Sequence, residues 1–427
     1  LGEELKTVKD LTVTGKINAA DIEGLIQASA LEVLNLTDAA IVDAEGKATT
    51  AFPGYTLRKH PTLTTLSLPK TITTIGSGAF FKCQKLKKVV LPQTIKKLNE
   101  TVFMSCSALS DINFPDGLES IGRNAFYMTA ITEFTAPKAL KTLGDNALYG
   151  TQITKAVLND RLEKIGQASF AACKQLAKIE IENNPNFKLV DGVLYSADET
   201  TLVAYPLADK RALYKTLPTV TTIYQGIFEG AVNLKDIYIN EGVKTIPVSL
   251  CCNTEALERM YWPATLTDVK AGAIDGCKKL RELHVAATKA PAADTGAFGV
   301  MFKNYTAYLY VPFGAKASYE ANEEWNENFL GIIEESTEPN TVVFRTNKAV
   351  GSVLALKVAA KEGEEIKIKG ASYNEKDELM LTDTEVTLYG KMTKIDCSSN
   401  QLASIVITNQ PQLRELYCDD NELTTIK

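Results

Sequence analysis

Eight cysteines and two histidines are the side chains of this 427-residue chain that could bind a metal ion or form disulfides. No two cysteines have the CxxC spacing of a zinc site, and the adjacent Cys251 and Cys252 are too close for ordinary disulfide geometry. His60 and His284 lie far apart in the sequence, which disfavours histidine-rich metal sites and most histidine-dependent triads. We therefore expect no metal site and no cofactor.

Signatures of catalysis are missing from the sequence. It contains no GxSxG, GxxxxGK[ST] or HExxH motif, and no GxGxxG motif that opens a helix. Acid pairs such as Glu323/Glu324 fall where solvated faces are expected. We predict that the chain has no catalytic residue and is not an enzyme.

The composition is that of a folded, mildly acidic protein. Hydrophobic residues make up 45% of the chain, charged residues 23%, and the net charge is -6. The lack of a basic excess argues against nucleic acid as a partner. No stretch approaches 18 apolar residues, so no membrane-spanning segment is predicted. We expect a monomer.

One sequence unit, LTTLSLPKTITTIGSGAFFKCQK, recurs along the chain with steps of 22 or 23 residues and a single gap of 58. Its copies begin at Leu63, Leu86, Leu109, Ile131, Ile153, Leu176, Leu234, Leu257 and Leu280. A fixed period of this length is typical of a solenoid, in which no coil can bury its apolar residues alone.

Each unit predicts the same local structure. Counting its first residue as zero, apolar residues at offsets three and five form a short strand with one buried face, as in Leu66 and Leu68. Proline at offset six ends the strand, as at Pro69. A large residue at offset seventeen, usually phenylalanine, fills the middle of the coil. The fold class is therefore mainly β, with short helical or irregular segments.

The cysteines follow the same period. Cys83, Cys106, Cys173 and Cys277 share offset twenty, Cys251 takes the phenylalanine offset, and Cys397 and Cys418 occupy core-facing strand positions. Their positions predict buried thiols that act as small hydrophobic side chains. A disulfide between Cys83 and Cys106 of adjacent coils is the alternative.

From Val8 to about Ile333 the units resemble the BspA-type leucine-rich repeat family, whose unit is LxxLxLPxxLxxIxxxAFxxCxxL. The resemblance implies a right-handed solenoid with a parallel β-sheet on its concave face. It also implies a secreted or bacterial cell-surface protein, for which a lipid anchor on a removed N-terminal leader is one mode of attachment. Such proteins bind host or microbial partners, and the resemblance names no ligand.

The units divide the chain into two predicted domains, a solenoid over 1–336 and a smaller β-rich domain over 337–427. An insertion near 183–211 contains two β-rich runs around Ser196 to Thr200, which predict a hairpin that projects from the solenoid. A cap is expected near 313–336, where the spacing of Trp325 and Phe329 fits a short amphipathic helix.

The C-terminal domain ends in a second type of repeat, LxxLxCxxNxL, with a period of 21 residues. Its two copies place Asn400 and Asn421 at equivalent turns, where their side-chain amides should form a ladder of hydrogen bonds. We interpret this domain as the start of a second leucine-rich repeat array that is truncated.

Candidate binding residues lie at offsets two and four, which point away from the core because side chains alternate along a strand. In the last four coils these positions are Asp236/Tyr238, Arg259/Tyr261, Glu282/His284 and Tyr308/Tyr310. Aromatic rings beside arginine are typical of binding hot spots, and a flat ring can also stack on a sugar. The alternative is that tyrosine is simply a good strand former.

From this pattern we predict an adhesin or protein-binding module. Its expected partners are extracellular host or microbial proteins. Glycan binding is the first alternative, and a structural spacer that displays a further domain is the second.

Overall fold

The computed structural model describes residues 2–299, 306–335 and 340–427. They form two compact units, Leu1–Val311 with Ala315–Ile333, and Pro312–Gly314 with Glu334–Lys427. The predicted domain boundary at residues 336 and 337 lies outside the described residues. No helix of the described part is long and apolar enough to cross a membrane.

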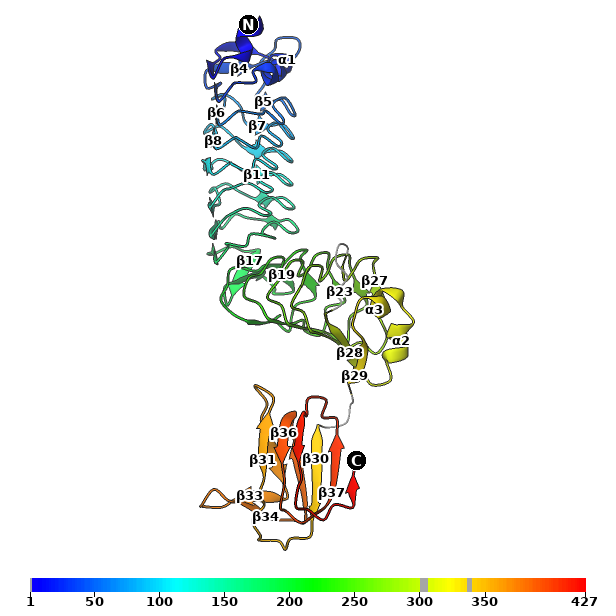
Figure 1. Cartoon of the computed structure of the whole chain (residues 1–427). Coiled ribbons are helices and arrows are strands. Elements are labelled where there is room, and N and C mark those ends of the chain that lie inside the picture. The colour runs from blue at the N-terminus through cyan, green and yellow to red at the C-terminus, as the bar shows by residue number, and fades with distance from the viewer. Residues whose placement is uncertain (1, 300–305, 336–339) are drawn as a thin grey trace. The chain divides into compact units, whose positions relative to one another are not determined.

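The first unit is a stack of coils, as Figure 1 shows, and each typical coil contributes one strand to a main series and a shorter strand to a second series. The main series consists of β1 (Asp10–Thr12), β3 (Val33–Asn35), β6 (Thr65–Ser67), β8 (Lys88–Val90), β10 (Asp111–Ile112), β12 (Glu133–Thr135), β14 (Lys155–Leu158), β16 (Lys178–Ile181), β20 (Leu213–Lys215), β22 (Asp236–Tyr238), β24 (Arg259–Trp262), β26 (Glu282–Val285), β28 (Tyr308–Pro312) and β29 (Ile332–Glu335). We call the side of the solenoid that these strands form the main-strand face.

The second series consists of β2 (Gly15–Ile17), β4 (Ala39–Ile41), β5 (Ala51–Phe52), β7 (Thr74–Ile75), β9 (Lys97–Leu98), β11 (Ser120–Ile121), β13 (Thr142–Leu143), β15 (Lys164–Ile165), β21 (Thr222–Ile223), β23 (Thr245–Ile246), β25 (Asp268–Val269) and β27 (Ala292–Ala293). Pairing between coils is parallel in both series, and in the regular coils it joins residues one period apart, such as Leu66 with Val89 and Thr74 with Lys97. The solenoid predicted from the repeat, and the parallel sheet that the resemblance implies, are therefore confirmed.

Stacked side chains fill the coils. The rings of Phe52, Phe80, Phe103 and Phe126 follow one another with centroids 5.3, 5.4 and 5.5 Å apart. The cysteines at offset twenty are buried free thiols, as predicted, and each Sγ donates to a carbonyl of the preceding coil. Cys397 is buried in the core of the second unit, and Cys418, which is half-buried, packs against that core, as predicted.

The insertion adds three strands, β17 (Phe187–Val190), β18 (Val193–Ser196) and β19 (Thr201–Ala204). β18 and β19 form the predicted antiparallel hairpin, but the prediction that it projects from the solenoid is wrong. β19 pairs in parallel with β21, as a coil would. Along β18, Leu194 packs in the core of the preceding coils, whereas Val193 and Tyr195 pack in the core of the following coils. The hairpin is buried on both faces because apolar residues alternate between two cores.

Short helices lie near the two ends of the solenoid. At the start are η1 (Gly2–Lys6), α1 (Ala19–Gly24) and η2 (Leu25–Gln27), with Asn18 and Asp21 forming a capping box on α1. The cap has two helices in place of the one predicted, α2 (Lys316–Glu320) and α3 (Glu323–Glu327). Tyr319 and Trp325 are buried there, and Trp325 Nε1 donates to Pro291 O at 2.8 Å.

Residues 340–427 of the second unit form ten strands around a core of their own. Its strands are β30 (Thr341–Thr346), β31 (Lys357–Ala360), β32 (Lys367–Lys369), β33 (Ala371–Tyr373), β34 (Leu379–Leu381), β35 (Glu385–Tyr389), β36 (Met392–Asp396), β37 (Leu402–Thr408), β38 (Glu415–Tyr417) and β39 (Thr425–Ile426). β30 lies between β35 and β37, antiparallel to both, whereas β36 pairs in parallel with β38 one period later. Asn421 Oδ1 accepts from Asn400 N at 2.9 Å, which confirms the asparagine ladder.

Candidate binding surface

Four neighbouring strands, β22, β24, β26 and β28, hold the predicted binding residues in register. Pairing places Tyr238 beside Tyr261, Tyr261 beside His284, and His284 beside Tyr310. The residues that alternate with them are fully buried, namely Ile237, Met260, Leu283 and Leu309. The burial of these apolar neighbours turns the aromatic side chains to the outside of the main-strand face.

The four rings form one continuous stack, which we call the aromatic ladder (Tyr238, Tyr261, His284 and Tyr310). Successive ring centroids are 4.0, 4.4 and 4.5 Å apart, and the ring planes differ by only 4°, 14° and 12°. Lys215 Nζ lies 4.8 Å from the ring centroid of Tyr238, at the beginning of the stack. A lysine over the face of a tyrosine ring is a favourable cation–π contact.

This stacking decides which parts of the rings a partner can reach. Both faces of Tyr261 and both faces of His284 are covered by neighbouring rings. The ladder therefore presents ring edges and polar atoms, and a sugar cannot lie flat on either inner ring.

Charged residues run beside the aromatic ladder. The guanidinium of Arg259 donates to both carboxylate oxygens of Asp236, with Nε at 2.5 Å and Nη2 at 2.9 Å. This bidentate pair raises the pKa of Arg259 and fixes its side chain. Glu282 Oε2 lies 3.2 Å from His284 Nε2. Tyr308 follows in the same row as Glu282 and is 43% exposed.

Burial also changes the acidity of one tyrosine in the aromatic ladder. The pKa of Tyr261 is raised, chiefly because burial disfavours the phenolate and also because Tyr238 is close. Tyr261 is therefore a neutral hydroxyl throughout the physiological range. All eight predicted residues lie together on the main-strand face, and their role in binding stays a prediction.

Sequence reasoning missed Lys215, which the register of β20 with β22 places beside Tyr238. The signal was present, because Lys215 has the same strand position in the degenerate coil that precedes Leu234. It was hidden because the insertion breaks the regular spacing.

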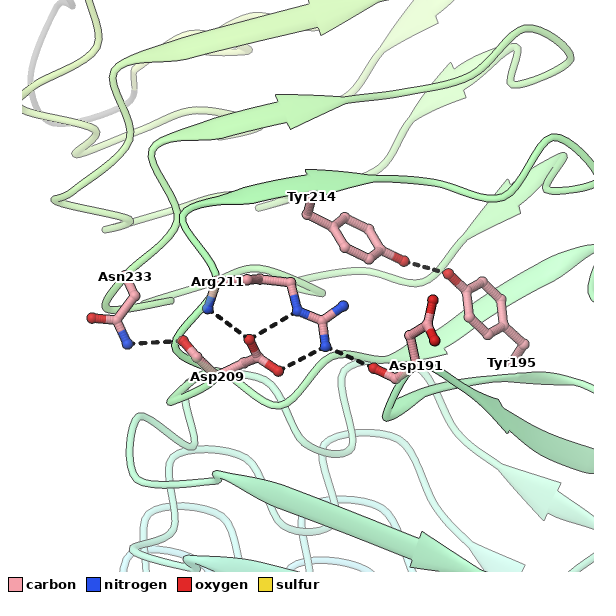
Figure 2. Close-up of polar contacts among 6 residues, drawn as sticks. All are labelled: Asp191, Tyr195, Asp209, Arg211, Tyr214 and Asn233. Atoms are coloured by element: carbon pink, nitrogen blue, oxygen red, sulfur yellow. Dashed lines mark hydrogen bonds and ion pairs between the residues drawn. The ribbon is translucent and has the colours of Figure 1, made fainter. Parts of the chain in front are cut away.

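A second group of polar residues that the sequence did not reveal lies at the insertion (Figure 2). Asp209 accepts from Arg211 Nε and Nη2 at 2.8 Å each, and Arg211 Nη2 also donates to the carbonyl of Asp191 at 2.6 Å. The hydroxyls of Tyr195 and Tyr214 are hydrogen-bonded to each other. These contacts tie the loop before β20 to the turn between β17 and β18.

The histidines and acids do not gather into a reactive centre. His60 is buried, Leu63 N donates to its Nδ1 at 3.2 Å, and its Nε2 lies 3.3 Å from Leu25 O. Across residues 2–299, 306–335 and 340–427, no three His, Cys, Asp or Glu side chains are grouped so as to hold a metal ion.

Comparison with known proteins agrees with this fold. The chain is similar to the solved structure of a leucine rich cell surface protein from Faecalibacterium prausnitzii A2-165, with 21% identity over 68% of this chain and 84% of that chain and a TM-score of 0.54. A leucine-rich repeat protein from Eubacterium ventriosum ATCC 27560 is 18% identical over 60% of this chain and 90% of that chain, with a TM-score of 0.44.

The pneumococcal vaccine antigen PcpA is 18% identical over 69% of this chain and 87% of that chain, also with a TM-score of 0.44. No curated protein matches the chain at a significant level. The family described as BspA type leucine rich repeat region matches in six copies, over residues 50–177 and 214–292. These two stretches of the chain therefore consist of BspA-type leucine-rich repeats.

Proposed function

We propose that the protein is a non-catalytic adhesin of the bacterial cell surface that binds an extracellular protein through the aromatic ladder and the charged residues beside it. Leucine-rich repeat surface proteins have a general role in protein interaction, and we assign that role to the ladder as part of this proposal. The observation that supports the proposal is the continuous stack of Tyr238, Tyr261, His284 and Tyr310.

Stacking matters for binding because it lowers the entropic cost of association. Each ring is already held by its neighbours, so a partner loses less free energy in ordering it. The bidentate pair of Arg259 with Asp236 holds the arginine in the same way. Rigid aromatic side chains beside a fixed arginine are the composition of binding hot spots.

The proposal is tested by the double variant Tyr238→Ala/Tyr261→Ala, with purified extracellular-matrix and serum proteins immobilised on a biosensor. We expect the wild type to bind at least one of these proteins and the double variant to bind it at least about tenfold more weakly. Circular dichroism verifies that the variant is folded.

The matched control is Thr135→Ala/Val157→Ala, because these residues face each other at the same strand position on β12 and β14. The control should bind like the wild type. Unchanged binding by the tyrosine variant, or an equal loss in the control, would place the binding surface elsewhere. A wild type that binds none of the proteins would leave the spacer function.

A further inference from the structure

The main-strand sheet is interrupted where the insertion enters. β16 pairs with β14 on one side, and β20 pairs with β22 on one side, but β16 and β20 are not paired with each other. β10 and β12 are also not paired with each other, but there the rings of Phe114 and Phe134 are in contact across the gap, with centroids 5.4 Å apart. The outer edge of β16 is thus a strand edge with which no described strand is paired.

Main-chain groups along this edge are those that normally bind the next coil. In a regular coil, Thr64 O accepts from Lys87 N at 2.8 Å and from Lys88 N at 3.0 Å. Ala177 is the equivalent residue of the coil that contains β16, and no amide of the described chain donates to its carbonyl. An open edge of this kind is a template for an added strand.

A groove runs along the open edge. It has a volume of about 420 Å³, and one wall is formed by the consecutive residues 177–182. The opposite wall is formed by Leu189, Gly192, Pro206 and Asp209 of the insertion. The ion pair of Asp209 with Arg211 and the bond from Arg211 to the Asp191 carbonyl hold this wall in place (Figure 2).

The side chains of the groove define the chemistry of its occupant. Ile181 and Leu189, which are half-buried, offer apolar contacts on the inner side, next to the buried Ile179 and Pro206. On the outer side, Lys155 and Lys178 share a single carboxylate, that of Glu180, at 2.8 and 2.7 Å. At this point of the edge two lysines share one glutamate, so Lys178 can pair with an acidic residue of the occupant, whereas Glu182 and Asp209 at the groove disfavour a second acid.

We propose that the outer edge of β16 binds an extended peptide segment of a partner protein, which adds to the sheet as a parallel strand. Its apolar residues alternate with polar ones, and an acidic residue lies opposite Lys178. Main-chain hydrogen bonds supply affinity and the alternate side chains supply specificity, as in other cases of strand addition. This site is separate from the aromatic ladder and does not depend on the proposed function.

The chain itself provides a suitable probe. A synthetic peptide of residues 233–241, NLKDIYINE, has the strand sequence of a regular coil and carries Asp236 where it would meet Lys178. In the solenoid, the amide of Asp236 donates to the preceding coil. The amide of Ile237 points the opposite way, since alternate amides of a strand point to opposite sides.

Binding of the fluorescently labelled peptide to the full chain is measured by fluorescence anisotropy. We expect saturable binding, lost on N-methylation of the Tyr238 amide, which points to β16, and retained within about twofold on N-methylation of the Ile237 amide. Equal loss with both peptides, or no binding of the parent peptide at 1 mM, an affinity limit of about 4 kcal/mol, would overturn the proposal.

A charge exchange locates the site. Lys178→Glu should weaken binding of the parent peptide at least about fivefold, and the peptide with Asp236→Lys should restore it. The matched control is Lys88→Glu, because Lys88 has the same strand position on β8, whose edges are both paired. Binding that is unchanged by Lys178→Glu, or weakened equally by Lys88→Glu, would show that the peptide binds elsewhere.

Discussion

The rings of Tyr238 and Tyr261 stack face to face, with centroids 4.0 Å apart and ring planes only 4° from parallel. We expect a double-mutant cycle of Tyr238→Ala and Tyr261→Ala to give a coupling free energy of about 0.5–1.5 kcal/mol, because aromatic pairs contribute this beyond their burial. Urea denaturation measures it. The cycle of Thr135→Ala with Val157→Ala, at the same strand position, should be close to additive. Additive losses for the tyrosines would mean that the stack itself contributes no stability.

Asn400 should be a main determinant of the stability of the second unit. It is fully buried, its Nδ2 donates to the carbonyls of Ala355, Cys397 and Ser398, and its Oδ1 accepts from Ala355 N. Asn400→Ala leaves several buried groups without partners, and we expect a loss of about 3 kcal/mol. Asn421 is more exposed, so Asn421→Ala should cost about 1 kcal/mol.

Calorimetry measures both losses, and fluorescence provides an internal control. The two tryptophans, Trp262 and Trp325, lie in the first unit. Their unfolding transition should therefore be the same in the wild type and in both asparagine variants. A loss for Asn421→Ala as large as that for Asn400→Ala would contradict the importance of burial.

We predict that all eight cysteines of the protein are free thiols. Cys83 Sγ donates to Leu57 O and Cys106 Sγ donates to Phe80 O, each at 3.0 Å, so both thiols are directed to the preceding coil. Burial raises the pKa of Cys173 to about 11, which makes its thiol unreactive in the folded protein. Alkylation in denaturant without reductant, followed by mass spectrometry, should add eight labels. Two labels fewer would indicate the bridge between Cys83 and Cys106.

His60 should make stability depend on mildly acidic pH. Leu63 N donates to Nδ1, so the buried ring is neutral with its proton on Nε2, and burial lowers its pKa below 6.5. The unfolded chain then binds the proton more readily than the folded chain. The contribution of His60 is therefore complete above pH 6.5 and is lost as the pH falls through its lowered folded pKa.

Urea denaturation between pH 7 and pH 5 measures this dependence. His60→Gln should be less stable at pH 7 but should lose less stability on acidification. An NMR titration of the His60 ring that gave a pKa above 6.5 in the folded protein would refute the prediction.

Glu229 should make stability depend on pH in the opposite direction from His60. It is buried, Tyr149 donates a hydrogen bond to its carboxylate, and burial raises its pKa above 4.5. Because the folded state favours the neutral acid, stability is lost as the pH rises from about 4.5 through the raised pKa. Glu229→Gln should therefore be more stable than the wild type at pH 7. Tyr149→Phe removes a hydrogen bond that lowers the pKa of Glu229, so this variant should lose more stability with rising pH than the wild type does. Thermal unfolding at pH 4 to 7 compares them, and equal slopes in all three proteins would rule out a role for this carboxyl.

The regular coils could be predicted from the sequence because every coil repeats the same constraints. The burial of Leu66 and Val89, the thiols at offset twenty and the row from Tyr238 to Tyr310 follow from one period. The insertion could not be predicted in this way. Whether Leu194 and Tyr195 face water or two different cores depends on the path of the chain around them.

The polar contacts at the insertion were unpredictable for the same reason. Arg211 reaches the carbonyl of Asp191 across 20 residues, and no periodic pattern encodes that distance. The exposed edge of β16 likewise exists only because the chain leaves the regular path after Ile181.

The hairpin of β18 and β19 has a consequence for folding cooperativity. Since Leu194 belongs to one core and Val193 and Tyr195 belong to the other, neither half of the solenoid can melt without exposing part of the hairpin. A nearest-neighbour array would otherwise unravel coil by coil. The hairpin therefore couples the unfolding of the two halves of the solenoid into one cooperative step.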